Sequence, residues 1–136
     1  MKLTTARRST IAQGIIADMT AGTTNPNPAL EFYTGTIPAS LGGAIADTLL
    51  ATLTPSATVA TESGGVITFG AITEDSSADA TGPAGWARIL DRNGVEANYL
   101  TVTGTGGGGD IELNTVDIVA GGPVAITSGT ITVGGA

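Results

Sequence analysis

The stretch ELNTVDIVAGGPVAITSGTITVGGA, from Glu112 to Ala136, decides the fold class of this chain. Isoleucine and valine alternate in it with threonine, serine and alanine, and no charged residue follows Asp117. A period of two is typical of β-strands that bury one face. The stretch therefore predicts two β-strands joined at Gly121-Gly122-Pro123, with stiff, small side chains that suit packing against other proteins better than chemistry.

Only the start of the chain has a helical pattern, in residues 4–21. One stripe of apolar side chains recurs there three and four positions apart: Ile11, Ala12, Ile15, Ile16 and Met19. Thr4 or Thr5 can cap the start, and Gly22 stands where a helix would end. We expect this amphipathic helix to lie against the β-body of the same chain.

From Ala29 onward the sequence predicts short strands separated by turn signals. The predicted strands are 30–34, 48–54, 65–77 with a bend at Gly70, 85–92, 95–103, 110–114, 116–120 and 123–133. Asn93-Gly94 marks a hairpin turn, and residues 35–47 form a long loop. This pattern predicts a mainly β fold, a jelly-roll-like antiparallel β-sandwich with a short N-terminal α-helix. We expect one structural domain, with a helical arm at 1–24 and the sandwich at 25–136.

The composition excludes several classes of function. A net charge of −7 and a pI near 4.1 argue against nucleic-acid binding. The chain has no cysteine and no histidine, so it lacks disulfides, thiol catalysis and the commonest general base and metal ligand. Its apolar runs are shorter than the ~20 residues of a membrane-spanning helix, and Gln13 and Asp18 interrupt a superficial likeness to a signal peptide. Charged residues make up only 12% of the chain, which is typical of a protein that lives inside an assembly.

Two segments could carry chemistry, and each has a simpler structural interpretation. GTGGGG at Gly104–Gly109 has the letters of a dinucleotide fingerprint, but a strand-like segment follows it instead of a helix. Asp75, Ser77 and Asp79 have the spacing that begins a calcium loop, but the glycine and glutamate of that loop are absent. We therefore interpret both segments as loops between strands.

Six carboxylates could pair as acid and base for glycoside cleavage: Glu31, Asp91, Glu96, Asp110, Glu112 and Asp117. Such clefts also need aromatic side chains for sugar stacking, and aromatic residues are only 4% of this chain. Trp86 could anchor an interface, but the largest apolar residue of a small β-body is expected in the core. We predict a protein that is not an enzyme and that uses no metal or cofactor.

Five segments, taken in order, resemble the small structural proteins of tailed bacteriophages, and within them most closely a capsid cement (decoration) protein. They are TTARRSTIAQGIIADMTAG (Thr4–Gly22), LEFYTGTIPAS (Leu30–Ser40), LLATLTPS (Leu49–Ser56), AITEDSSADATGPAGWARILDRNG (Ala71–Gly94) and LNTVDIVAGGPVAITSGTITV (Leu113–Val133). The loop at Val102–Asp110 and the run at Glu112–Val119 depart from the pattern of that group. The resemblance implies a jelly roll that dimerises on the outside of the major capsid shell and carries no catalytic residues.

The expected function is therefore that of a non-enzymatic capsid cement protein that stabilises the shell across capsomer contacts. The expected location is the outer capsid surface of the virion. The expected partners are the major capsid protein and a second copy of the chain, without nucleic acid or membrane. The alternatives are a tail or fibre-associated β-module, a carbohydrate-binding β-sandwich and, more distantly, a hydrolase that uses paired carboxylates.

Interface residues are predicted in three regions of the chain. These regions are the helix face, the long loop and the edge formed by the C-terminal strand. The predicted residues are Arg7, Arg8, Ile11 and Ile15 on the helix, Ile37, Pro38 and Leu41 in the loop, and Ile126 and Ile131 on the strand.

Overall fold

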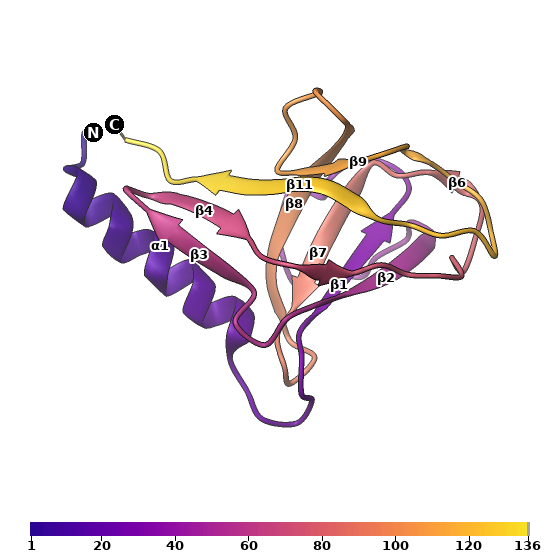
Figure 1. Ribbon diagram of the computed structural model, residues 1–136, viewed down its shortest axis with the longest axis horizontal. Coiled ribbons are helices and arrows are strands. Elements are labelled where there is room, and N and C mark those ends of the chain that lie inside the picture. The colour runs from indigo at the N-terminus through magenta and orange to yellow at the C-terminus, as the bar shows by residue number, and fades with distance from the viewer. Residues whose placement is uncertain (136) are drawn as a thin grey trace.

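The computed structural model describes residues 1–135, which form a large curled β-sheet with one helix at the N-terminal end (Figure 1). Strands hold 39% of the residues and helix 12%, so the predicted mainly β fold with an N-terminal helix is confirmed. The elements are α1 (Thr5–Thr20), β1 (Ala29–Tyr33), β2 (Leu49–Pro55), β3 (Ala60–Ser63), β4 (Val66–Phe69), β5 (Ile72–Thr73), β6 (Gly82–Pro83), β7 (Trp86–Leu90), β8 (Glu96–Gly104), β9 (Ile111–Leu113), β10 (Asp117–Ile118) and β11 (Ile126–Thr132).

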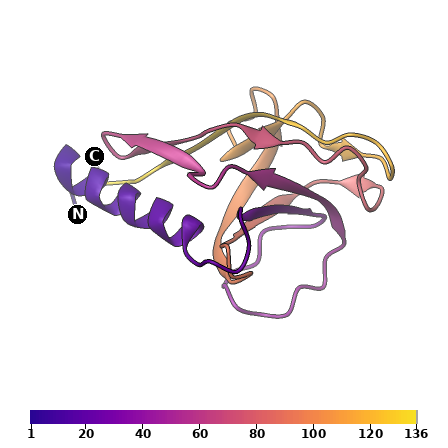
Figure 2. The same ribbon diagram turned by 60° about the horizontal axis from the view of Figure 1, so that its bottom comes forward.

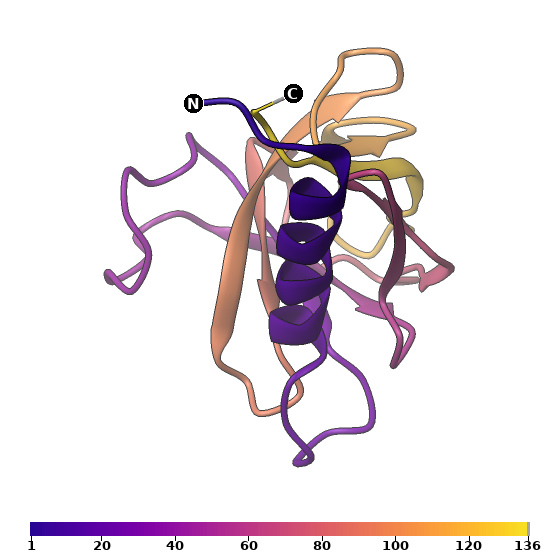
Figure 3. The same ribbon diagram turned by 90° about the vertical axis from the view of Figure 1, so that its left-hand side faces the viewer.

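Helix α1 lies along β3 and β4 at one end of the sheet (Figures 1 and 3). The Thr4 hydroxyl caps it by accepting a hydrogen bond from the Arg7 amide at 3.3 Å. Ala12 and Met19 are fully buried, which confirms that the helix packs on the β-body of its own chain. The buried face of the helix does not coincide with the predicted apolar stripe, because Ile11 belongs to that stripe and is 43% exposed.

The nine strands of the main sheet follow the order β3-β4-β11-β9-β8-β7-β1-β2-β5. Strands β8 and β9 run parallel, whereas the other neighbours in this order are antiparallel. The parallel pair departs from the fully antiparallel sheet that the sequence predicts. The glycine-rich loop after β8, where Gly106 and Gly108 both take a φ of +83°, returns the chain beside the strand that it has just left.

The segment from β4 to β5 connects the two ends of the sheet, because the β3–β4 hairpin lies at one end and β5 at the other. β4 pairs with β3 and β11, and β5 pairs with β2 at the opposite end. Gly70 and Ala71 lie outside the strands and separate β4 from β5, at the place where the sequence predicts a bend. Asp75 and Val124 add two backbone hydrogen bonds of 3.0 and 2.7 Å beyond β5. The sheet therefore curls around its apolar core and does not remain open.

The predicted hairpin between β7 and β8 is confirmed, and it also holds the end of the helix. Its turn is closed by Asp91, whose carboxylate accepts from the Asn93 and Val95 amides at 2.8 and 3.0 Å. The Asn93 side chain oxygen accepts from the amides of Thr23 and Thr24 at 3.2 and 3.3 Å. These contacts fix the chain that leaves α1 against the end of the sheet.

Two short strands are absent from the sequence prediction. β3 has the polar sequence ATES and forms a hairpin with β4 through Gly64 and Gly65, which both have positive φ. β6 consists of Gly82-Pro83 and pairs with β10 in a separate two-stranded sheet. Neither segment has the alternation of apolar and polar residues that identifies a strand in a sequence.

The C-terminal stretch forms strands on both sides of Gly121-Gly122-Pro123, as predicted, but these strands do not pair with each other. β10 pairs with β6, whereas β11 pairs with β9 over residues 126–129 and with β4 over 130–132. The end of the chain returns to the start of α1, so the N- and C-terminal ends lie side by side (Figures 1 and 3). Within residues 1–135, no helix combines the length and the hydropathy that crossing a bilayer requires.

Candidate interaction site

A stack of three aromatic rings lies on the face of β1, β7 and β8 that is turned away from the main apolar core. The Tyr33 and Trp86 ring centroids are 4.8 Å apart with planes inclined by 16°, and the Tyr99 ring is 4.9 Å from Trp86 at 58°. Trp86 is fully buried, as predicted, but it is buried in this aromatic stack and not in the main core. On β7 it is the small neighbour Ala87 that points into the main core, so the larger Trp86 lies on the opposite face.

A charged cluster adjoins the stack on the same face. The guanidinium of Arg88 binds the Glu31 carboxylate at 2.7 Å and lies 3.5 Å from the Glu96 carboxylate. The Tyr33 hydroxyl donates to Glu31 at 2.7 Å, and Arg88 lies 5.5 Å from the centre of the Tyr33 ring. Two of the six carboxylates noted in the sequence are thus brought together, one on each side of an arginine.

The surroundings of these groups shift their pKa values in consistent directions. Burial, followed by the hydrogen bond to Glu31, raises the pKa of Tyr33 to about 12. Burial alone would lower the pKa of Arg88, but the hydrogen bond and charge of Glu31 raise it overall. The Glu96 carboxylate, and then burial, raise the pKa of Tyr99, while the backbone of Gly42 acts in the opposite direction. Gly42 belongs to the loop 35–47, so this loop reaches the same cluster.

We predict that the Tyr33 hydroxyl makes stability fall at alkaline pH. A raised pKa means that the folded protein holds this proton more tightly than the unfolded chain does. The contribution is therefore complete below the usual pKa of 10.0, falls as the pH rises toward about 12, and is lost above that. Phenolate absorbance of the folded protein should show one titration near 12 that Tyr33→Phe removes. A midpoint near 10.0 for both tyrosines would contradict this assignment.

The loop 35–47 rises from a closed stem beside the aromatic stack. The Thr34 amide donates to the Thr48 carbonyl at 3.1 Å, and the Thr48 amide donates to the Thr34 hydroxyl at 3.0 Å. The Trp86 indole N–H donates to the Asp47 carboxylate at 2.9 Å and to the Thr34 carbonyl at 3.0 Å. Both ends of the loop are therefore fixed to one buried side chain.

Beyond the stem the loop projects past the strands, as the purple segment between β1 and β2 shows in Figures 2 and 3, while its backbone at Gly42 acts on the pKa of Tyr99. From Thr36 to Ala46 it has no charged residue. Ile37 is 40% exposed and Leu41 is 55% exposed, while Pro38 is half-buried. The structure thus places the predicted loop residues together on a surface loop whose stem is fixed.

The predicted helix residues are divided between the surface and the interior. Arg7 and Ile11 are exposed, whereas Ile15 is half-buried and packs against the core. Arg8 is also half-buried, because its Cβ lies against the turn at Gly65, where an added Cβ would be only 2.6 Å from it. Arg7 and Ile11 therefore remain available on the outer side of α1.

The predicted strand edge at Ile126 and Ile131 is wrong. The sequence prediction placed the C-terminal strand at an edge, but β11 lies inside the sheet order between β4 and β9. Both isoleucines are half-buried and pack against the core. Their role in an interface stays a prediction without the free strand edge that suggested it.

The glycine-rich loop 104–109 directs its amides to a carboxylate of the same chain. The Gly108 amide donates to Glu112 at 2.9 Å, and the Ser128 hydroxyl lies 3.4 Å from the other carboxylate oxygen. The amides of Gly108 and Gly106 hold the pKa of Glu112 below its usual range. A loop that holds its own anion in this way is a turn between strands, which agrees with the structural interpretation of this motif.

The acidic segment around Asp75 also serves the fold. Its carboxylate accepts from the Thr52 amide and from the Ser77 amide, both at 3.0 Å. Asp79 is exposed, and its amide donates to the Leu50 carbonyl at 2.8 Å. Among residues 1–135, no three Asp or Glu side chains converge in a way that could hold a metal ion.

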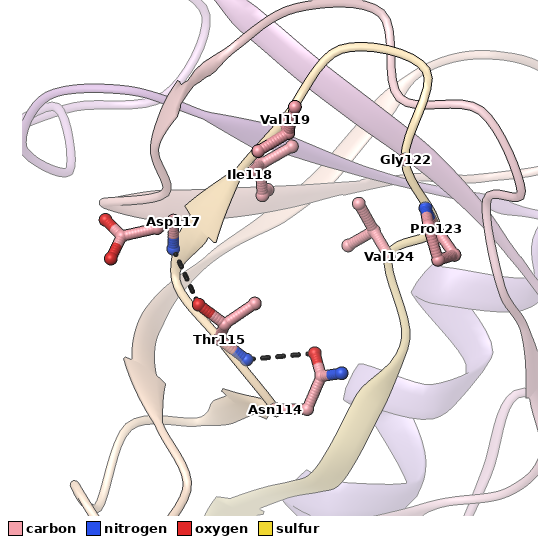
Figure 4. A pocket seen from close by; sticks show the side chains of 8 residues that line it. All are labelled: Asn114, Thr115, Asp117, Ile118, Val119, Gly122, Pro123 and Val124. Carbon is pink, nitrogen blue, oxygen red and sulfur yellow. Dashed lines mark hydrogen bonds between the residues drawn. The ribbon is translucent and has the colours of Figure 1, made fainter.

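A cavity of about 180 Å³ lies between β10 and the segment that leads into β11 (Figure 4). Ile118 and Val119 face Pro123 and Val124 across it, and the Asp117 carboxylate points away. A second cavity, of about 350 Å³, has Asp91 as the one acidic residue in its lining. Neither lining includes a pair of carboxylates or an aromatic ring that could bind a sugar.

Comparison of the chain with protein-family models, curated proteins and solved structures gave no match. The candidate site therefore rests on its own geometry. It comprises the loop 35–47 and the cluster beside its stem.

The sequence prediction identified Ile37, Pro38 and Leu41 but missed Asp47, whose carboxylate holds the loop stem through Trp86. It named Glu31 and Glu96 only as candidate acids and missed the cluster that they form with Arg88 beside the stem. The alternation in EFY and in WARIL places Glu31 and Arg88 on the face opposite the core. Only the register of β1 with β7 makes them direct neighbours, and a single sequence does not contain that register.

Proposed function

We propose that this chain is a non-enzymatic structural protein of a tailed-phage virion, a cement protein that binds the outside of the major capsid shell. The observation that carries this proposal is the loop 35–47, which has no charged residue from Thr36 to Ala46 and exposes Ile37 and Leu41 on a fixed stem. Apolar side chains on a fixed support bind another protein with little loss of conformational entropy. The resemblance of five segments to phage structural proteins supplies the identity of the partner.

The arrangement of the charged groups also favours a structural role. Glu31 and Glu96 flank Arg88, and Glu112 is bound by glycine amides, so these carboxylates already have partners in the fold. Many copies of a small protein can stabilise a shell through weak contacts that act together. A symmetric dimer on the shell surface, with the major capsid protein as partner, is the form that we propose.

The experiment that tests this function is binding of the purified protein to phage heads from which it has been removed. Co-sedimentation followed by cryo-electron microscopy should show regular density on the outer capsid surface at symmetry-related positions. Density confined to the tail would assign the chain to a tail or fibre module instead. Absence of binding to the whole particle would overturn the proposal and direct the next measurements to glycans and calcium.

A further inference from the structure

We infer that the loop 35–47 is the principal docking element and that it inserts Ile37 and Leu41 into an apolar, uncharged groove of a protein partner. This inference rests on the proposed function and specifies the surface through which it acts. It also assigns a positioning role to Asp47, which holds the stem of the loop through Trp86.

The first argument is the contrast between the stem and the rest of the loop. The stem is held by two hydrogen bonds between Thr34 and Thr48 and by the indole of the fully buried Trp86. Beyond the stem, Leu41 leaves 55% of its surface in water and Ile37 leaves 40%. A hydrophobic side chain that its own fold does not cover gains binding energy when a partner covers it. The fixed stem lowers the entropic cost of that step.

The second argument concerns the chemistry of the partner surface. From Phe32 to Ala46 the chain has no charged side chain, although the whole protein carries a net charge of −7. Asp47, the one charged residue of the loop, is held at the stem by Trp86. A charged group buried in the groove would therefore find no countercharge on the segment 36–46 and would lose its hydration without compensation. The groove that fits this loop is consequently apolar and uncharged.

The third argument comes from the other predicted interface regions. Ile15, Ile126 and Ile131 pack against the core of their own chain, so a partner can reach only part of each side chain. Arg8 is packed against the β3–β4 turn. The loop is the predicted region in which two large apolar residues are both exposed within five positions of each other.

The test compares Leu41→Asp and Ile37→Asp with Val95→Asp in binding to the stripped phage heads. Val95 is 59% exposed, so its replacement adds the same charge at a similarly exposed apolar position outside the loop. We expect each loop variant to weaken binding about tenfold or more and the control to stay within about twofold of wild type. Circular dichroism checks that the three variants fold alike.

The outcomes separate this inference from the function on which it rests. If the wild-type chain binds the phage heads and the three variants bind them equally well, the docking role of the loop is overturned and the cement function is left intact. Failure of the wild-type chain to bind any part of the particle would overturn both. Flotation of the chain with neutral phosphatidylcholine vesicles, lost in Leu41→Asp, would replace the protein groove with a lipid surface.

The positioning role of Asp47 has its own comparison. Asp47→Ala removes the acceptor for the indole N–H and should weaken binding several-fold, because the loop is then ordered only on docking. Asp47→Asn retains an oxygen that can accept the same hydrogen bond and should restore binding to nearly the wild-type level. Equal loss in both variants, or loss in neither, would overturn this role.

Discussion

Gly85→Ala is expected to lower the free energy of unfolding by about 3 kcal/mol or more. A Cβ added at Gly85 would overlap the carbonyl oxygen of Gly35 and lie 2.9 Å from its carbonyl carbon. Both obstacles are backbone atoms, so no side chain can rotate to make room. The Gly85 amide also donates to the Tyr33 carbonyl at 2.8 Å, which keeps the two segments at this separation.

The cost is large because the loop stem would have to move as a unit. Gly35 follows Thr34, whose carbonyl accepts from Trp86 and whose amide pairs with Thr48. Displacing Gly35 would therefore strain the contacts that bury the indole. Urea denaturation followed by far-UV circular dichroism measures the change, and Trp86 fluorescence should report the altered stem.

Gly43→Ala provides the matched control in the same loop. An added Cβ at Gly43 has no atom within 4 Å, and its φ lies outside the left-handed region. We expect this change to alter stability by less than about 0.5 kcal/mol, or to raise it slightly by restricting the unfolded chain. Equal stability of the two variants would show that the approach of Gly85 to Gly35 does not constrain the fold.

The sequence predicts the elements of this fold better than their arrangement. The helix at 4–21 and most strands follow from local periodicity, and Gly70 and Asn93-Gly94 mark a break between strands and a turn that the structure contains. The parallel pairing of β8 with β9 leaves no such local signal, because a strand has the same alternation whichever way its neighbour runs. The sequence does not predict β3, because this segment is polar and becomes a strand only through its pairing with β4.

The same division applies to the candidate site. The uncharged loop between two strands is visible in the sequence, and Ile37 and Leu41 are exposed on it. The position of β11 inside the sheet removed the basis for a strand edge at Ile126 and Ile131. The interaction of Asp47 with Trp86 joins residues 39 positions apart, and no periodicity predicts such a contact.

Trp86→Ala is expected to lower the free energy of unfolding by about 3–5 kcal/mol. The indole is fully buried between Tyr33 and Tyr99, so its removal leaves a cavity where two ring contacts had been. It also removes the donor that joins Asp47 to the Thr34 carbonyl. Denaturation followed by circular dichroism is the suitable measurement, because this variant has no tryptophan left.

Trp86→Phe separates packing from hydrogen bonding in this cluster. A phenylalanine ring keeps most of the stack but donates no hydrogen bond, so we expect a smaller loss, about 1–2 kcal/mol. If Phe costs as much as Ala, the indole N–H bonds to Asp47 and Thr34 hold the cluster together and the rings only fill space. If Ala costs less than about 1 kcal/mol, the stack stabilises neither the sheet face nor the stem of loop 35–47. We expect the loss of unfolding free energy to be much larger in Trp86→Ala than in Trp86→Phe. That result would establish that ring packing fixes the stem and that the hydrogen bonds orient it.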